Sequence, residues 1–133
     1  MIIDTHAHLN FSDYDADRDE VIKRTLADNV HCINVGCSLD SSKKAVQLAE
    51  KHEGFYAAIG LHPTDADEAF DVQGYRELAK SKKVVAIGEI GLDFFRKPFD
   101  EQKPSAIAPS GVAQRASLRA KQNNVRIAIL NSG

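Results

Sequence analysis

Two histidines near the N-terminus, His6 and His8, are separated by one residue and follow an apolar start at Met1. Side chains two positions apart on an extended segment point to the same side, so both imidazoles can reach one ion. Neutral imidazole is a common ligand for zinc and similar divalent metals. The alternative is a pair of histidines that only meets solvent at a strand end. We expect a metal site at His6 and His8.

An acidic residue, Glu89, lies between two glycines, Gly88 and Gly91. Small neighbours let the backbone approach other groups closely. A carboxylate in such a place can bridge two divalent cations, which lie about 3.5–4 Å apart in two-metal sites. The alternative is a solvated glutamate in a turn. We expect Glu89 to be both a metal ligand and a catalytic residue.

A third histidine, His62, precedes Pro63. Proline restricts the residue before it to extended conformations, which holds His62 in a defined direction. We expect His62 to contact a phosphate or to orient a water at the metal, so it is a candidate for both catalysis and substrate binding. The alternative is a loop histidine that only packs.

Three further polar residues lie beside these candidates. Asp4 stands two residues before His6, where it can support a metal ligand or cap a strand. Asp93 and Arg96 follow Glu89 in an irregular stretch. Asp93 is a second candidate to support the ligands, and Arg96 can pair with a phosphate through its planar guanidinium. A surface arginine is the equal alternative.

Short apolar runs that alternate with amphipathic stretches must position these residues. Strands are predicted at residues 1–4, 31–35, 55–59, 84–87 and 125–130. Helices are predicted at about residues 17–29, within residues 68–82, and at about residues 112–123. A further helix is predicted to begin at a cap at Asp40 or Ser41 and to end before Gly54. Repeated strand–helix units predict an α/β fold with a parallel sheet, as a doubly wound sheet or a (β/α)₈ barrel. Four units and a fifth strand make a partial TIM barrel, about half of one.

The candidate ligands recur at the same place in this pattern. His6 and His8 are expected after the first strand, His62 after the third and Glu89 after the fourth. Functional groups of parallel α/β folds gather at the carboxyl ends of strands. The sequence therefore predicts that these side chains meet.

Three segments resemble the TatD family of metal-dependent hydrolases: DTHAHL at residues 4–9, GLHP at residues 60–63 and GEIGLD at residues 88–93. The resemblance is clear over residues 1–96 and weaker over residues 97–133. We treat residues 1–133 as a single truncated domain. It implies a TIM-barrel deoxyribonuclease that hydrolyses DNA phosphodiester bonds with water activated by Mg²⁺, Zn²⁺ or Mn²⁺. His6 and His8 would hold one metal, and Glu89 would bridge to a second.

The resemblance also shows departures. Family members are about twice as long and take further ligands from later strands, including a histidine after the fifth strand. Leu130 stands at that place here, and leucine cannot bind a metal. We expect an incomplete second metal site and a truncated, frameshifted or naturally half-length chain. Its open sheet edge is expected to favour self-association or marginal stability.

Composition and charge limit the ligands and the cellular location that we expect for this chain. The net charge is −2, so binding of a phosphodiester needs local positive charge from a metal or a small basic cluster. The sequence shows no apolar run of the length that a membrane helix needs and no secretory signal, so we expect a cytoplasmic protein. Cys32 and Cys37 are expected to be reduced thiols.

Three functions fit these observations. The leading hypothesis is a TatD-type deoxyribonuclease. The alternative is a catalytically inactive half-barrel that binds metal weakly or serves as an interaction module. A third is a related hydrolase of another ester or an amide, because a fold does not fix the substrate.

Overall fold

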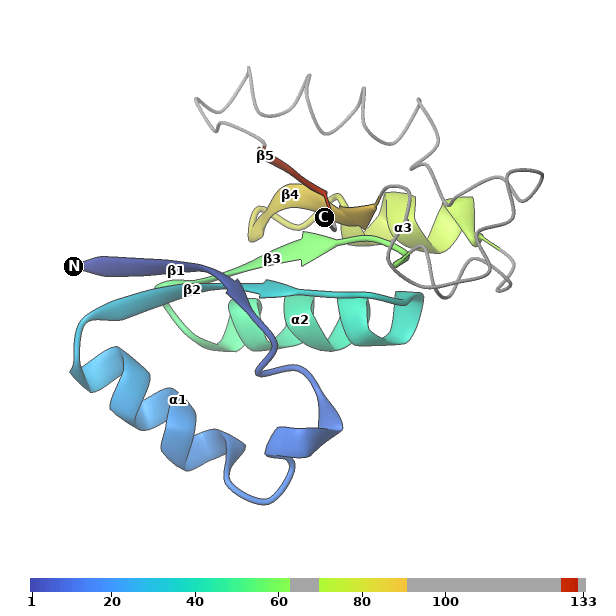
Figure 1. Cartoon of the computed structure of the whole chain (residues 1–133). Coiled ribbons are helices and arrows are strands. Elements are labelled where there is room, and N and C mark those ends of the chain that lie inside the picture. Colours follow the sequence, from blue (N-terminus) through green and yellow to red (C-terminus); the bar gives the residue numbers. More distant parts are fainter. Residues whose placement is uncertain (63–69, 91–127, 132–133) are drawn as a thin grey trace.

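The computed structural model describes residues 1–62, 70–90 and 128–131. Figure 1 shows a parallel sheet with helices packed against it. The strands are β1 (Ile2–Ala7), β2 (Val30–Val35), β3 (Phe55–Ile59), β4 (Val84–Ile90) and β5 (Ala128–Asn131). The helices are the 3₁₀ turn η1 (Ser12–Tyr14), α1 (Arg18–Ala27), α2 (Leu39–Lys51) and α3 (Val72–Leu78). No helix in the described part of the chain is long and apolar enough to cross a membrane.

The order of the strands decides between the two predicted architectures. The sheet runs β1-β2-β3-β4-β5, and each described strand pairs in parallel with the next along the chain. A doubly wound sheet reverses direction at a switch point, whereas a barrel adds each strand beside the last. This strand order agrees with the predicted α/β fold of a partial barrel.

Two strands continue further than their apolar runs predicted. β1 includes His6, and β4 includes Glu89, so neither residue follows its strand as expected. The cause is backbone pairing: Ala7 is in register with Asn34, and Ile90 is in register with Asn131. Each extension comes after an irregularity in the register. His8 does follow its strand, by one residue.

One helix boundary also differs from the prediction. α2 is capped by Ser38 rather than by Asp40 or Ser41, because Ser38 and Ser41 form a reciprocal capping box. α3 lies within the predicted range of residues 68–82. The predicted helix at residues 112–123 and the start of the predicted fifth strand lie outside the described residues.

Most of the packing lies on the face of the sheet that carries α1 and α2 (Figure 1). We call this cluster the helix-side core. Its buried members are Leu9, Ile22, Cys32, Ala45, Val46, Ala49, Phe55, Ala57, Ile59, Leu61, Tyr75 and Ile87.

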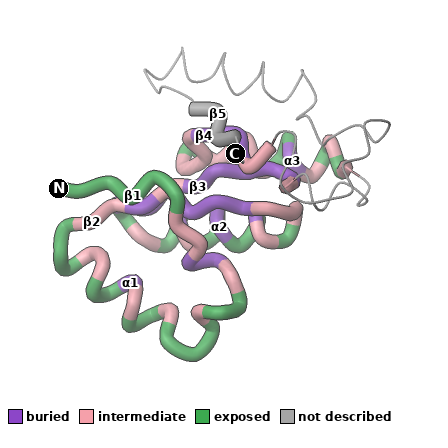
Figure 2. The backbone as a smooth tube through the Cα atoms, in the orientation of Figure 1, coloured by how far each residue is buried: buried purple, intermediate pink, exposed green. Residues whose placement is uncertain are grey.

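In the described part of the chain, the opposite face of the sheet carries a much smaller apolar cluster, which we call the open-side cluster. It consists of Val35, Ala58 and Ala86, with Ile33 packed against them. These residues alternate with members of the helix-side core along β2 and β3, as expected for a strand covered on both faces. Figure 2 shows the contrast with β1, whose N-terminal part is exposed.

Candidate metal centre

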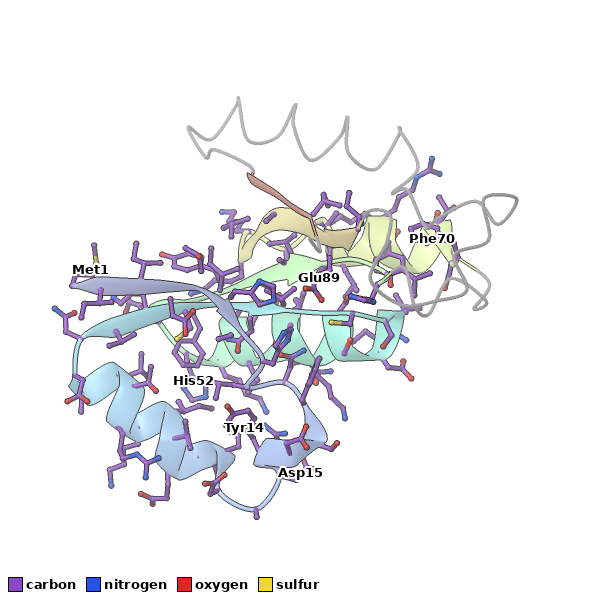
Figure 3. The ribbon with its side chains drawn as sticks, in the orientation of Figure 1. Met1, Tyr14, Asp15, His52, Phe70 and Glu89 are labelled. Atoms are coloured by element: carbon purple, nitrogen blue, oxygen red, sulfur yellow. The ribbon has the colours of Figure 1, made fainter. Side chains whose placement is uncertain are left out.

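His6, His8 and Glu89 come together at the carboxyl ends of β1 and β4. Each offers a ligand atom, and the three atoms lie within 4.8 Å of one another. His6 and His8 come from the end of β1, and Glu89 comes from β4. The side chain of Glu89 projects from β4 toward the strands before it in the sheet (Figure 3). Two histidines near the N-terminus and a glutamate at least 81 positions later therefore form one group that could hold a metal ion.

The ring of His8 is held in a defined orientation. Its Nδ1 donates a hydrogen bond to the carbonyl oxygen of Val35 at 3.0 Å. Phe11 stacks on the ring, with centroids 4.3 Å apart. The bond at Nδ1 fixes the tautomer and leaves the lone pair of Nε2 for a metal. The same carbonyl accepts a second hydrogen bond, from Nδ2 of Asn10 at 3.1 Å.

The carboxylate of Glu89 has different neighbours at its two oxygens. Oε1 lies 3.3 Å from Nε2 of His6. Oε2 accepts a hydrogen bond from Sγ of Cys37 at 3.1 Å and lies 3.9 Å from Nε2 of His62. The side chain of Glu89 is only 13% exposed, so protein groups rather than water provide most of its surroundings.

A glycine at the end of β3 lets β4 come close. A Cβ on Gly60 would lie 2.5 Å from the carbonyl carbon of Gly88 and 2.7 Å from the carbonyl oxygen of Glu89. Real Cβ atoms are not found so near backbone atoms, so any other residue would push β4 away. Gly60 therefore helps to place Glu89 beside the histidines.

The remaining predicted site residues are placed as follows. Asp4 accepts a hydrogen bond from the backbone N–H of His6 at 3.0 Å, so it supports the backbone of a ligand and not its ring. His62 is 17% exposed at the side chain and lies on the Oε2 side of Glu89. Arg96 and Asp93 lie outside the described residues.

Three contributors to the site were missed in the sequence. Cys37 lies at the carboxyl end of β2, and such a position is the same signal that identifies His62. Phe11 stacks on His8, and Asn10 donates to the Val35 carbonyl that also holds His8, through contacts that form only after the chain turns back. A short turn connects His8 to Phe11, because the N–H of Phe11 donates to the carbonyl of His8 at 2.9 Å.

The donor set fits a divalent cation. Two imidazoles and a carboxylate are the ligands of many zinc, manganese and iron sites, and three protein ligands leave positions for water or substrate. The described side chains provide a single group of this kind. A second cation would need ligands beyond the ones that the structure describes.

Comparison with known proteins defines the class. The family model described as "TatD related DNase" matches residues 3–124. The chain belongs to this family, which confirms the resemblance seen in the three motifs.

Two curated relatives match most of this chain. The chain is 44% identical over 108 residues to the "Uncharacterized metal-dependent hydrolase YabD" of Bacillus subtilis, covering 77% of this chain and 42% of the relative. It is 41% identical over 98 residues to the "3'-5' ssDNA/RNA exonuclease TatD" of Cronobacter sakazakii, covering 71% of this chain and 37% of the relative. The chain thus spans less than half the length of these curated relatives.

A solved structure supports the fold. The crystal structure of the TatD homologue YJJV from Escherichia coli K12 superposes with a TM-score of 0.68 at 26% identity. The match covers 98% of this chain and 50% of that one. The predicted fold, half of a TIM barrel, is confirmed by this match.

Proposed function

We propose that this chain carries the N-terminal part of the active site of a metal-dependent hydrolase that cleaves phosphodiester bonds of DNA. The observation that carries the proposal is the convergence of His6, His8 and Glu89, with ligand atoms within 4.8 Å of one another. Membership of the TatD-related DNase family supports the reaction class. One relative is named as an exonuclease of single-stranded DNA and RNA, which makes single-stranded nucleic acid the first substrate to test.

Each residue has a role in this proposal. His6, His8 and Glu89 would hold one divalent cation, and Glu89 would also reach toward a second. Such a cation would polarise a phosphoryl oxygen, lower the pKa of water and attract phosphate to a chain of net charge −2. Two imidazole ligands favour Zn²⁺ or Mn²⁺ over Mg²⁺, which prefers oxygen ligands.

His62 has a separate role. Its ring lies 3.9 Å from Oε2 of Glu89 and is partly exposed, so it can donate a hydrogen bond to a phosphate oxygen or orient a water beside the carboxylate. Arg96 is proposed to bind the phosphate as well, on the basis of its place in the sequence after Glu89.

Replacement of Glu89 by Gln tests the proposal. Removing the charged ligand should weaken Mn²⁺ binding, measured by calorimetry, by at least about 100-fold, the upper end of the loss expected for a residue that only supports a ligand. Metal-dependent cleavage of end-labelled single-stranded DNA should fall with it. Glu53→Gln, which makes the same change at an exposed position, is the matched control. Unchanged Mn²⁺ binding in Glu89→Gln would reject the site.

A second function is favoured by one specific observation. The described side chains provide one three-residue ligand group and not two. A chain that binds one cation but does not hydrolyse DNA is the half-barrel alternative, in which the protein binds metal or acts as an interaction module. Tight binding of one Mn²⁺, with no cleavage of DNA at saturating metal, would identify this case.

A further inference from the structure

We propose that Cys37 is a positioning residue for Glu89: its thiol holds Oε2 and thereby turns Oε1 toward the cation at His6 and His8. The proposal rests on the metal site proposed above and names a residue outside the ligand set. It is carried by three hydrogen bonds that fix Cys37 and by the different surroundings of the two carboxylate oxygens.

Cys37 is tied to three elements at once. Its backbone N–H donates to Oγ of Ser41, in the capping box of α2, at 2.8 Å. Its carbonyl oxygen accepts from the backbone N–H of His62, after β3, at 2.8 Å. Its Sγ donates to Oε2 of Glu89, in β4, at 3.1 Å. The backbone of Cys37 is therefore anchored on both sides, which restricts its Sγ to the rotamers available from a fixed Cα.

The bond from the Cys37 thiol to Oε2 sets the orientation of the Glu89 carboxylate. The terminal torsion of a glutamate side chain is broad, so a carboxylate without fixed partners samples many orientations. Here the thiol occupies one lone-pair direction of Oε2, and Oε1 faces Nε2 of His6 at 3.3 Å. A thiol is a weak donor. A charged acceptor strengthens the bond, and the 13% exposure of the Glu89 side chain limits competition from water.

Cys37 is not placed as a ligand of the first cation. The atoms that lie within 4.8 Å of one another belong to His6, His8 and Glu89, and Sγ of Cys37 is outside this group. It lies on the Oε2 side of the carboxylate, away from the oxygen that faces His6. The geometry therefore assigns Cys37 to the orientation of a ligand.

The second cysteine provides a matched comparison. Cys32 lies in the helix-side core, where burial, and to a smaller extent the charge of Asp4, raise the pKa of its thiol. It is five residues from Cys37 but belongs to a different environment. The change Cys32→Ala therefore removes the same thiol without removing a bond to Glu89.

The experiment compares Mn²⁺ affinity, by calorimetry, with the melting temperature of each variant. Cys37→Ala should weaken Mn²⁺ binding by about 10–100-fold, as is typical when a partner of a metal ligand is lost. Cys37→Ser should recover most of that loss, because its hydroxyl can donate to Oε2. Cys32→Ala should lower the melting temperature and leave the affinity unchanged. If Cys37→Ala gives no cooperative transition, Cys37→Val replaces it, since valine fills the space without a donor.

A Co²⁺ spectrum provides a readout that loss of stability does not move. The wild-type complex should lack the sulfur-to-cobalt charge-transfer band that a bound thiolate produces, and the d–d bands should change in Cys37→Ala. A charge-transfer band would overturn the proposal by making Cys37 a ligand. Equal Mn²⁺ affinity in Cys37→Ala and wild type would also overturn it.

Failure of this proposal is distinguishable from failure of the proposed function. If Glu89→Gln abolishes Mn²⁺ binding while Cys37→Ala does not change it, the metal site stands and only the role of Cys37 is wrong. If Glu89→Gln binds Mn²⁺ as the wild type does, both are wrong.

Discussion

The two faces of the sheet are built differently. Among the residues that the structure describes, the helix-side core buries twelve, including Phe55 and Ile59. The open-side cluster buries three of the described residues, and two of them are alanines. The ligand residues depend on strand ends and hydrogen bonds, whereas the apolar packing is concentrated under the helices. From this difference we expect the stability of the chain and its proposed metal binding to be largely separate. Two substitutions test that separation, and a third tests the exposed strand β1.

The largest effect is expected at Phe55, which is fully buried in the helix-side core. Phe55→Ala should lower the free energy of unfolding by about 3–5 kcal/mol, through lost transfer energy and the cavity left behind. Urea unfolding followed by circular dichroism measures the change. In the fraction that remains folded, Mn²⁺ affinity should be that of the wild type. A loss of affinity in the folded fraction would show that the helix-side core and the candidate metal site are coupled.

An intermediate effect is expected at the N-terminus of α2. Ser38→Ala removes the side chain that accepts from the N–H of Ser41, and should cost about 1 kcal/mol of stability. This position sharpens the comparison because Ser41 also accepts a hydrogen bond from Cys37. If Mn²⁺ affinity falls together with the melting temperature, the packing of α2 is coupled to the candidate metal site. An unchanged melting temperature would mean that the capping box does not contribute.

The smallest effect on stability is expected at Ile3, which is 52% exposed on β1. Ile3→Lys should change the free energy of unfolding by no more than about 0.5 kcal/mol, the usual range for surface sites. It should nevertheless reduce self-association, because a charge on an edge strand opposes pairing with another sheet. Sedimentation velocity across a concentration series measures it, with Gln73→Lys on α3 as the charge control. A wild-type chain that is monomeric with a cooperative thermal transition would refute the expected self-association.

Apolar runs predicted the elements of the sheet well. The range of β3 was predicted to the residue, because the strand is apolar and followed by Gly60. The ends of β1 and β4 were not predicted, since His6 and Glu89 are polar and their strands are extended by pairing with β2 and β5. Residue type alone does not reveal a backbone ladder that depends on a neighbouring strand.

The convergence of the candidate ligands could be predicted from the sequence, but the residues that support them could not. His6, His8 and Glu89 stood out because metal-binding residue types recur at strand ends. The bond from Cys37 to Glu89 spans 52 residues, and it depends on the side-by-side placement of β2, β3 and β4. The capping residue of α2 was also misplaced, because Ser38, Asp40 and Ser41 are all good caps and only the backbone conformation selects among them.

The carbonyl of Val35, which accepts hydrogen bonds from both His8 and Asn10, has a consequence for mutational tolerance. A backbone oxygen is present whatever side chain stands at that position. The orientation of the His8 ring is therefore insensitive to replacement of Val35 by another residue that keeps the strand intact. Substitutions at this position during evolution can therefore alter the packing while the orientation of the His8 imidazole stays the same.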